Sequence, residues 1–346
     1  MSGVLWGLII ASLVLTAFSL VLGLTAVAAH FTSKNQKRTR QQNREQWRQA
    51  LVDVIVGDAS PQALSDQVEP SQRNQFLSFL VVYATTVRGQ ALERIREVAR
   101  PLLSTAEKNL HARSRMVRAQ AVRRIGLLGG RERAGVLDDA LDDNSEFVAL
   151  IAFRHLAEWS GPNDAPRLLN AVPHLSRADR VQLVSALVEV GEEAAPFFRK
   201  ELRSGERSVF ERVVCAETLR WLGDGDAAPV AVDLLKTSDP DPELTAALLR
   251  LLRRVGNPRH APIVRRHCRA DVPFVRIQAT RALGQLGEDQ DASLLADQVQ
   301  NDPSRWVALS AAQSLAELGR TDQLRRLSES GDDRASIAAD LLPARA

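Results

Sequence analysis

A short segment recurs along most of this chain at a nearly constant interval. Residues 275–287 are closely matched by residues 307–319 and, nearer the N-terminus, by residues 117–129. Four looser copies lie between them, so that the copies end at positions 129, 160, 191, 223, 256, 287 and 319, in steps of 31 to 33 residues. Self-similarity at such a period is typical of arrays in which each repeat stacks on its neighbours. It restricts this part of the chain to a repeat architecture.

The pattern inside each copy predicts two helices. Apolar or small residues fall on one helical face, and a glycine follows where the helix should end in a left-handed conformation, as in Val275, Ala279, Leu283, Leu286 and Gly287. Helix termination also accounts for Gly126, Gly129 and Gly130. A polar turn and a second helix come next, and only 5% of all residues are aromatic, so the core is built from Leu, Val and Ala. We predict an all-α fold, an α-solenoid of about seven two-helix repeats.

The sharpest copies resemble the short HEAT repeat, the variety also called the phycobilisome-lyase HEAT-like repeat. The resemblance rests on Asp-x-x-x-Val-Arg at residues 271–276, on Ala-x-x-x-Leu-Gly-x-Leu-Gly at 279–287, and on Asp-x-x-x-x-Val at 302–307. It covers about residues 115–345. In the middle of the array Asp179, Glu211 and Leu244 take the place of the first valine, which leaves the repeat boundaries there open.

The resemblance also implies a role for the arginine that follows the first valine. In this repeat family such an arginine commonly pairs with the turn aspartate of a neighbouring repeat. Here that implies a pair between Arg276 and either Asp271 or Asp302, with Arg118 in the corresponding position of the first repeat.

The N-terminal stretch predicts a membrane anchor. Residues 2–33 carry no Asp, Glu, Lys or Arg, and apolar residues fill 4–31 almost continuously, more than the roughly 20 residues a helix needs to cross a bilayer. Basic residues follow, which favours an N-terminus outside the cell and a cytoplasmic remainder at the inner membrane of a bacterial cell. The alternative is a cleaved secretory signal ending near Ala26-Val27-Ala28, which the absence of a basic residue before the apolar run disfavours.

The charge distribution supports a division along the chain. Residues 34–134 carry 19 basic and 9 acidic side chains, whereas residues 135–346 carry 26 and 33. We therefore predict that basic residues next to the span contact anionic lipid: Lys34, Lys37, Arg38, Arg40 and Arg44. The predicted parts are a transmembrane helix at 1–33, a basic juxtamembrane helix at 34–57, a helical N-cap region at 58–114, the repeat solenoid at 115–330 and a C-terminal half-repeat cap at 331–346.

No arrangement of residues predicts catalysis or a cofactor. His260, His267 and Cys268 are close in sequence, but a tetrahedral zinc site needs a fourth ligand that is missing nearby. Cys215 and Cys268 are the only two cysteines and fit buried thiols in a reducing compartment. We predict no enzyme activity, no metal and no cofactor. Three tryptophans are expected in the core or between repeats: Trp159, Trp221 and Trp306.

Basic residues on two second helices are the candidate partner-binding site. They are Arg199, Lys200, Arg203, Arg265, Arg266 and Arg269. Second helices line one long face of a solenoid, and a basic stripe there could receive an acidic protein segment. We predict a membrane-tethered scaffold that binds a membrane-associated protein partner, with no small-molecule substrate. Two alternatives are a chromophore-lyase-like or ligand-binding protein and a nucleic-acid-binding protein; the acidic balance of residues 135–346 disfavours the latter.

Overall fold

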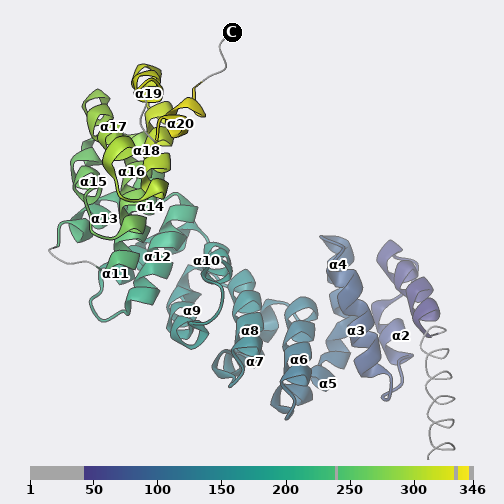
Figure 1. Cartoon of the computed structure of the whole chain (residues 1–346). Coiled ribbons are helices and arrows are strands. Elements are labelled where there is room, and N and C mark those ends of the chain that lie inside the picture. The colour runs from purple at the N-terminus through teal and green to yellow at the C-terminus, as the bar shows by residue number, and fades with distance from the viewer. Residues whose placement is uncertain (1–42, 238–240, 331–333, 343–346) are drawn as a thin grey trace, which may run out of the picture. The chain divides into compact units, whose positions relative to one another are not determined.

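The computed structural model describes residues 43–237, 241–330 and 334–342. These residues form helices and turns, with no strand among them (Figure 1). The chain divides into two compact units. The first contains the described residues up to 108 together with 127–129, and the second contains 109–126 and the described residues from 130 onward. The prediction of an all-helical, solenoid-like fold is confirmed.

The first unit is a small helical bundle with an aromatic core. Trp47, on the helix of residues 43–56, lies 5.1 Å from Phe76 and 5.8 Å from Phe79, measured between ring centroids. The Trp47, Leu51 and Val54 side chains are buried, which holds this helix in the unit. The other elements are α2 (Pro61–Asp66), α3 (Arg73–Ala84), α4 (Gln90–Ala99), a 3₁₀ turn (Arg100–Leu102) and α5 (Leu103–Glu107).

The structure overturns one prediction about this region. None of the described helices is long and apolar enough to cross a membrane. This finding contradicts the predicted inner-membrane localisation, which is not retained. The predicted span at 1–33 and the candidate lipid-contacting residues Lys34, Lys37, Arg38 and Arg40 lie outside the described residues. Arg44 is described and lies exposed on the helix of residues 43–56.

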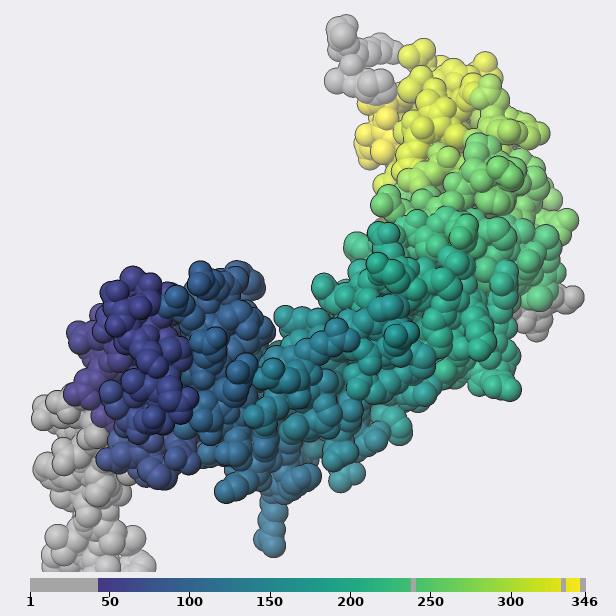
Figure 2. Space-filling model, turned by 180° about the vertical axis from the view of Figure 1, so that it is seen from behind, coloured from purple at the N-terminus to yellow at the C-terminus, as the bar shows by residue number. Residues whose placement is uncertain are grey.

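The second unit consists of helix pairs that follow one another along the chain (Figure 1). The surface of this unit follows the same chain order, from blue to yellow (Figure 2). In its described residues there are seven such pairs, each with a first and a second helix. The pairs are α6 (Arg115–Leu128) and α7 (Ala134–Asp138), α8 (Glu146–Trp159) and α9 (Ala165–Ala171), α10 (Arg180–Val188) and α11 (Ala195–Arg203), α12 (Val209–Leu222) and α13 (Ala227–Leu235), α14 (Pro242–Val255) and α15 (Ala261–His267), α16 (Pro273–Leu286) and α17 (Ala292–Asn301), and α18 (Arg305–Glu317) and α19 (Thr321–Ser328). A short helix, α20 (Ala335–Ala339), follows the last pair and packs on α19 and α18.

The first helices stack directly on one another. From α8 to α18 each first helix packs on the next one, and from α11 onward each second helix packs against the first helix that follows it. The contact face is the predicted one: Val275, Ala279, Leu283 and Leu286 of α16 are all buried. Because each repeat buries its apolar face only against its neighbours, the core continues from one repeat to the next.

Two repeat junctions are closed by the same arginine clamp. Arg276 of α16 donates from Nε and Nη2 to the two carboxylate oxygens of Asp302, at 2.8 and 2.9 Å. Its Nη1 donates to the carbonyls of Ala270 and Asp271, both at 2.9 Å. The implied pairing is therefore confirmed for Asp302, whereas Asp271 contributes its backbone oxygen.

The clamp at the other end of the array has matching geometry. Arg118 of α6 donates to both carboxylate oxygens of Asp143, at 2.7 and 2.8 Å, and to the carbonyls of Ala112 and Arg113. Each aspartate also accepts the backbone N–H two residues on, from Ser145 and Ser304. The turn before α8 and the turn before α18 are thereby fixed to the preceding first helix.

The glycines of the repeat serve three different purposes. Gly223 ends α12 in the left-handed conformation, with φ of 72°, as predicted. Gly287 instead has extended backbone, and a Cβ there would overlap the carbonyl oxygen of Leu283. Gly126 does not terminate a helix: it lies inside α6, where a Cβ would overlap the ring of His155 from α8. The interpretation of Gly126 as a helix end is therefore wrong.

Candidate functional site

The six candidate partner-binding residues lie in the layer of second helices, on α11 and α15 or directly after them. Two of the six form ion pairs with the following repeat. Arg199 donates from Nη1 to Asp224 at 2.6 Å, and Arg265 donates from Nε to Asp291 at 2.5 Å. The hydrogen bond to Asp291, a fully buried residue, raises the pKa of the Arg265 guanidinium. These two arginines therefore fix one repeat to the next and are not available to a partner.

The remaining four residues are exposed. Lys200, Arg203, Arg266 and Arg269 project into solvent, and no ion pair or hydrogen bond joins their side chains to any described residue. Between them lies α13, whose C-terminal end carries a pair of its own, Asp233 with Lys236 at 3.3 Å. The predicted stripe is thus reduced from six residues to four.

The histidines and cysteines considered for a metal do not converge. In the described residues no group of three or more His, Cys, Asp or Glu side chains is placed to hold a metal ion. His260 Nδ1 accepts the backbone N–H of Asn257 at 3.2 Å, as in a helix cap. Burial lowers the pKa of both His260 and His267. Burial raises the pKa of the Cys268 thiol to about 12, so this thiol remains protonated at neutral pH.

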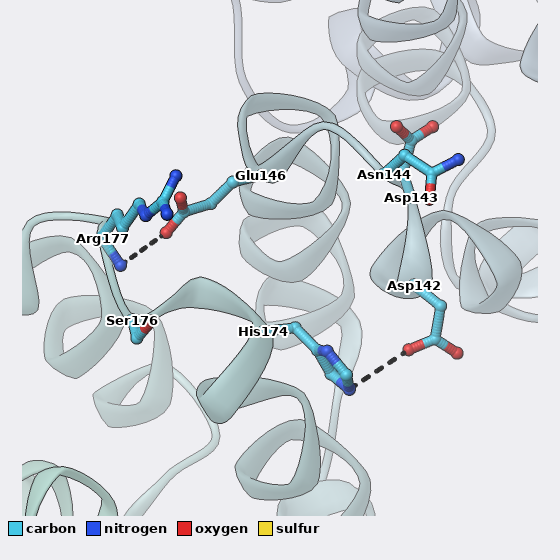
Figure 3. A pocket seen from close by; sticks show the side chains of 7 residues that line it. All are labelled: Asp142, Asp143, Asn144, Glu146, His174, Ser176 and Arg177. Atoms are coloured by element: carbon cyan, nitrogen blue, oxygen red, sulfur yellow. Dashed lines mark hydrogen bonds and ion pairs between the residues drawn. The ribbon is translucent and has the colours of Figure 1, made fainter.

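A polar pocket lies between the turns that precede α8 and α10 (Figure 3). Its volume is about 410 Å³. Most of its charged groups are already engaged: Glu146 accepts the backbone N–H of Arg177 at 2.7 Å, and Asp143 belongs to the Arg118 clamp. His174 Nε2 lies 3.8 Å from an oxygen of Asp142, and both side chains are mostly exposed. The other lining residues are Asn144 and Ser176. The charged groups of the pocket are therefore mostly used in contacts within the chain.

Exposed apolar side chains form a feature that the sequence analysis missed. Trp159 is buried as predicted, but Trp221 is 62% exposed and Trp306 is 71% exposed, so the expectation that these two pack in the core or between repeats is wrong. Trp306 is the second residue of α18, and Phe274 and Phe147 are the second residues of α16 and α8. Both phenylalanines are also exposed, by 42% and 54%.

We call this row of second residues the first-helix edge. Its members, one from each first helix in chain order, are Met116, Phe147, Val181, Phe210, Glu243, Phe274 and Trp306. A sequence signal for it existed, because an apolar residue directly precedes the buried valine in Phe147-Val148, Phe274-Val275 and Trp306-Val307. The helical pattern alone places that residue one step outside the buried face.

Comparison with known proteins supports the repeat assignment. A family model described as HEAT repeats matches residues 232–316, from within α13 to α18. No curated protein matches the chain.

Solved structures with a similar arrangement are distant in sequence. A mutant of Kap121p is 15% identical, with a TM-score of 0.45, over 81% of this chain and 38% of that one. The complex of CpcE and CpcF of phycocyanin lyase from Nostoc sp. PCC7120 is 18% identical, with a TM-score of 0.32, over 69% and 93%. Human deoxyhypusine hydroxylase is 17% identical, with a TM-score of 0.32, over 72% and 97%. This chain thus spans little more than a third of the Kap121p chain.

Proposed function

We propose that this protein is a non-catalytic scaffold that binds a protein partner through the surface of its HEAT-like solenoid. The observation that carries the proposal is the set of four basic side chains without a partner, Lys200, Arg203, Arg266 and Arg269. Arg199 and Arg265, on the same helices, stabilise the array through aspartates. The four others have no such role, and a repeat array offers them a long, continuous surface for a partner.

Charge reversal on the second helices tests this proposal. The tagged full chain and the variant Lys200→Glu/Arg203→Glu/Arg266→Glu are purified in parallel from the native host. We expect a partner in fixed stoichiometry with the wild-type chain and its loss from the variant, because three attractive contacts become repulsive. Circular dichroism establishes that the variant is folded.

A matched variant controls for the change in net charge. Arg123, Arg154 and Arg254 are exposed on first helices, so reversing these three gives the same net charge at a different surface. We expect this control to retain the partner. A wild-type chain that purifies without any stoichiometric protein, or equal loss in both variants, contradicts the proposal.

A further inference from the structure

Large apolar side chains are not scattered over the surface of the second unit. Eight of them are exposed in its described residues, and seven of the eight lie at the start of a first helix; Trp221 is the exception. The seven are Met116, Val117, Phe147, Val181, Val209, Phe274 and Trp306. Exposed apolar residues that gather on one face typically mark an interaction site, whereas single ones need no explanation.

Arginines precede three members of the first-helix edge, at a position where arginine does not stabilise a helix. Arg115, Arg180 and Arg305 are the first residues of α6, α10 and α18. The N-terminus of a helix carries partial positive charge, so a cation there is unfavourable, whereas an anion is favourable. Helix formation therefore gives no reason for arginine at these positions, but the binding of an anion does.

One of these arginines already binds a carboxylate of the chain itself. Arg180 Nη2 donates to Glu243 at 2.9 Å, and its guanidinium carbon lies 5.9 Å from the ring centroid of Phe210. The contact runs from α10 past α12 to α14, so the starts of three first helices lie side by side. In the middle of the first-helix edge, an acidic group is thus held by arginine beside an aromatic ring.

Exposed arginines and exposed aromatic rings also occur at the starts of the last two first helices, where no described carboxylate is bound to the arginines. Arg305 and Trp306 are both exposed at the start of α18, and Arg269 and Phe274 are exposed around the start of α16. Neither arginine side chain pairs with any described residue. The nearby Asp302 is already engaged by Arg276. The exposed Asp271 partly offsets this charge and leaves a net positive surface around two aromatic rings.

We propose that the first-helix edge at α16 and α18 binds an acidic segment of a partner protein whose apolar side chains rest on Phe274 and Trp306. This inference deepens the proposed function and rests on it. Carboxylates of the segment would pair with Arg269 and Arg305, as Glu243 pairs with Arg180. Packed helices lie about 8–10 Å apart, and an extended polyproline-II segment presents a side chain on the same face about every 9 Å, at each third residue. The matching partner sequence therefore has an apolar residue every third position and acidic residues between them.

Synthetic peptides test this inference without the natural partner. The probe is a fluorescein-labelled peptide of four Leu-Asp-Glu repeats, and its match is four Ser-Asp-Glu repeats of equal charge. Fluorescence anisotropy with the full chain should show that the leucine peptide binds at least about tenfold more tightly, since an apolar anchor supplies much of such affinity. Its binding should weaken as salt rises, because exposed charges are screened.

Two variants locate the site. Trp306→Ser and Arg305→Glu should each weaken the binding of the leucine peptide by about tenfold or more. Trp221→Ser, which removes another largely exposed tryptophan outside the edge, should leave binding unchanged. Equal binding by wild type and Trp306→Ser, or no preference for leucine over serine, overturns the inference. If sedimentation shows a wild-type dimer that Trp306→Ser dissociates, the edge is instead a contact between two copies. Retention of the natural partner by Trp306→Ser overturns only the edge and leaves the proposed function intact.

Discussion

Single ion pairs hold the repeats together, and Asp302 gives the sharpest case. Its side chain is almost fully buried and satisfies two nitrogens of Arg276 and the N–H of Ser304. Asp302→Ala leaves the guanidinium buried without its partner, and we expect the free energy of unfolding to fall by about 3 kcal/mol. Urea denaturation followed by circular dichroism measures the change.

The neighbouring aspartate is the control for this prediction. Asp271 is exposed, and Arg276 uses its backbone carbonyl, which any residue supplies. Asp271→Ala should therefore change the free energy of unfolding by no more than about 0.5 kcal/mol. Equal effects of the two substitutions would mean that the clamp is not a stabilising contact.

The corresponding Asp143 should make stability depend on pH. Hydrogen bonds from Arg118 hold the pKa of this carboxyl below its ordinary value, which is roughly 3.9 in an unfolded chain. Because the folded-state pKa is the lower one, its contribution is fully present above the unfolded pKa and is lost as pH falls through the folded pKa.

Thermal melting of wild type and Asp143→Asn across pH tests this dependence. The difference between their midpoints should stay constant from about pH 7 to pH 5 and shrink below about pH 4. Asp142→Asn serves as the control, since the Asp142 side chain is 77% exposed. A midpoint difference that is unchanged at low pH contradicts the assignment.

At the scale of helices, Gly126 sets how closely α6 and α8 approach. A Cβ at this position would overlap the His155 ring, whose side chain is only 14% exposed and has little room to move. Gly126→Ala should therefore destabilise the protein by about 1–3 kcal/mol, even though alanine favours helix formation. Gly135→Ala, in α7 with no atom near the added Cβ, should be neutral or slightly stabilising. The double variant Gly126→Ala/His155→Ala should recover part of the loss.

The same glycine shows where sequence reasoning reaches its limit. The repeat period and the buried face of α16 were predictable, because both depend only on the spacing of apolar residues. The repeat motif limited the partner of Arg276 to Asp271 or Asp302 but did not choose between them. The role of Gly126 was not, since it depends on which side chain of another repeat lies opposite. The ion pairs of Arg199 and Arg265 were likewise not predictable, because the aspartates that they contact lie about 25 residues away, in the following repeat.

At the scale of the whole array, stability should be local. A repeat contacts mainly its neighbours, so the loss of one junction weakens the adjoining repeats and leaves distant ones unaffected. Two clamps of the same geometry lie near opposite ends of the second unit, Arg118–Asp143 before α8 and Arg276–Asp302 before α18. Replacing the aspartate of either clamp removes the same type of contact at a different place, so the two substitutions form a matched pair.

Amide hydrogen exchange measures the local effect of each of the two substitutions separately. Asp302→Ala should speed exchange in α17, α18 and α19 by at least about tenfold while α6 to α9 keep wild-type rates, since local opening free energies vary along a repeat array. Asp143→Ala should produce the reverse pattern. Faster exchange throughout the unit in both variants would instead mean that all the repeats unfold as one cooperative block. The expected local response follows from the packing, because each of these two junctions has its own arginine–aspartate clamp.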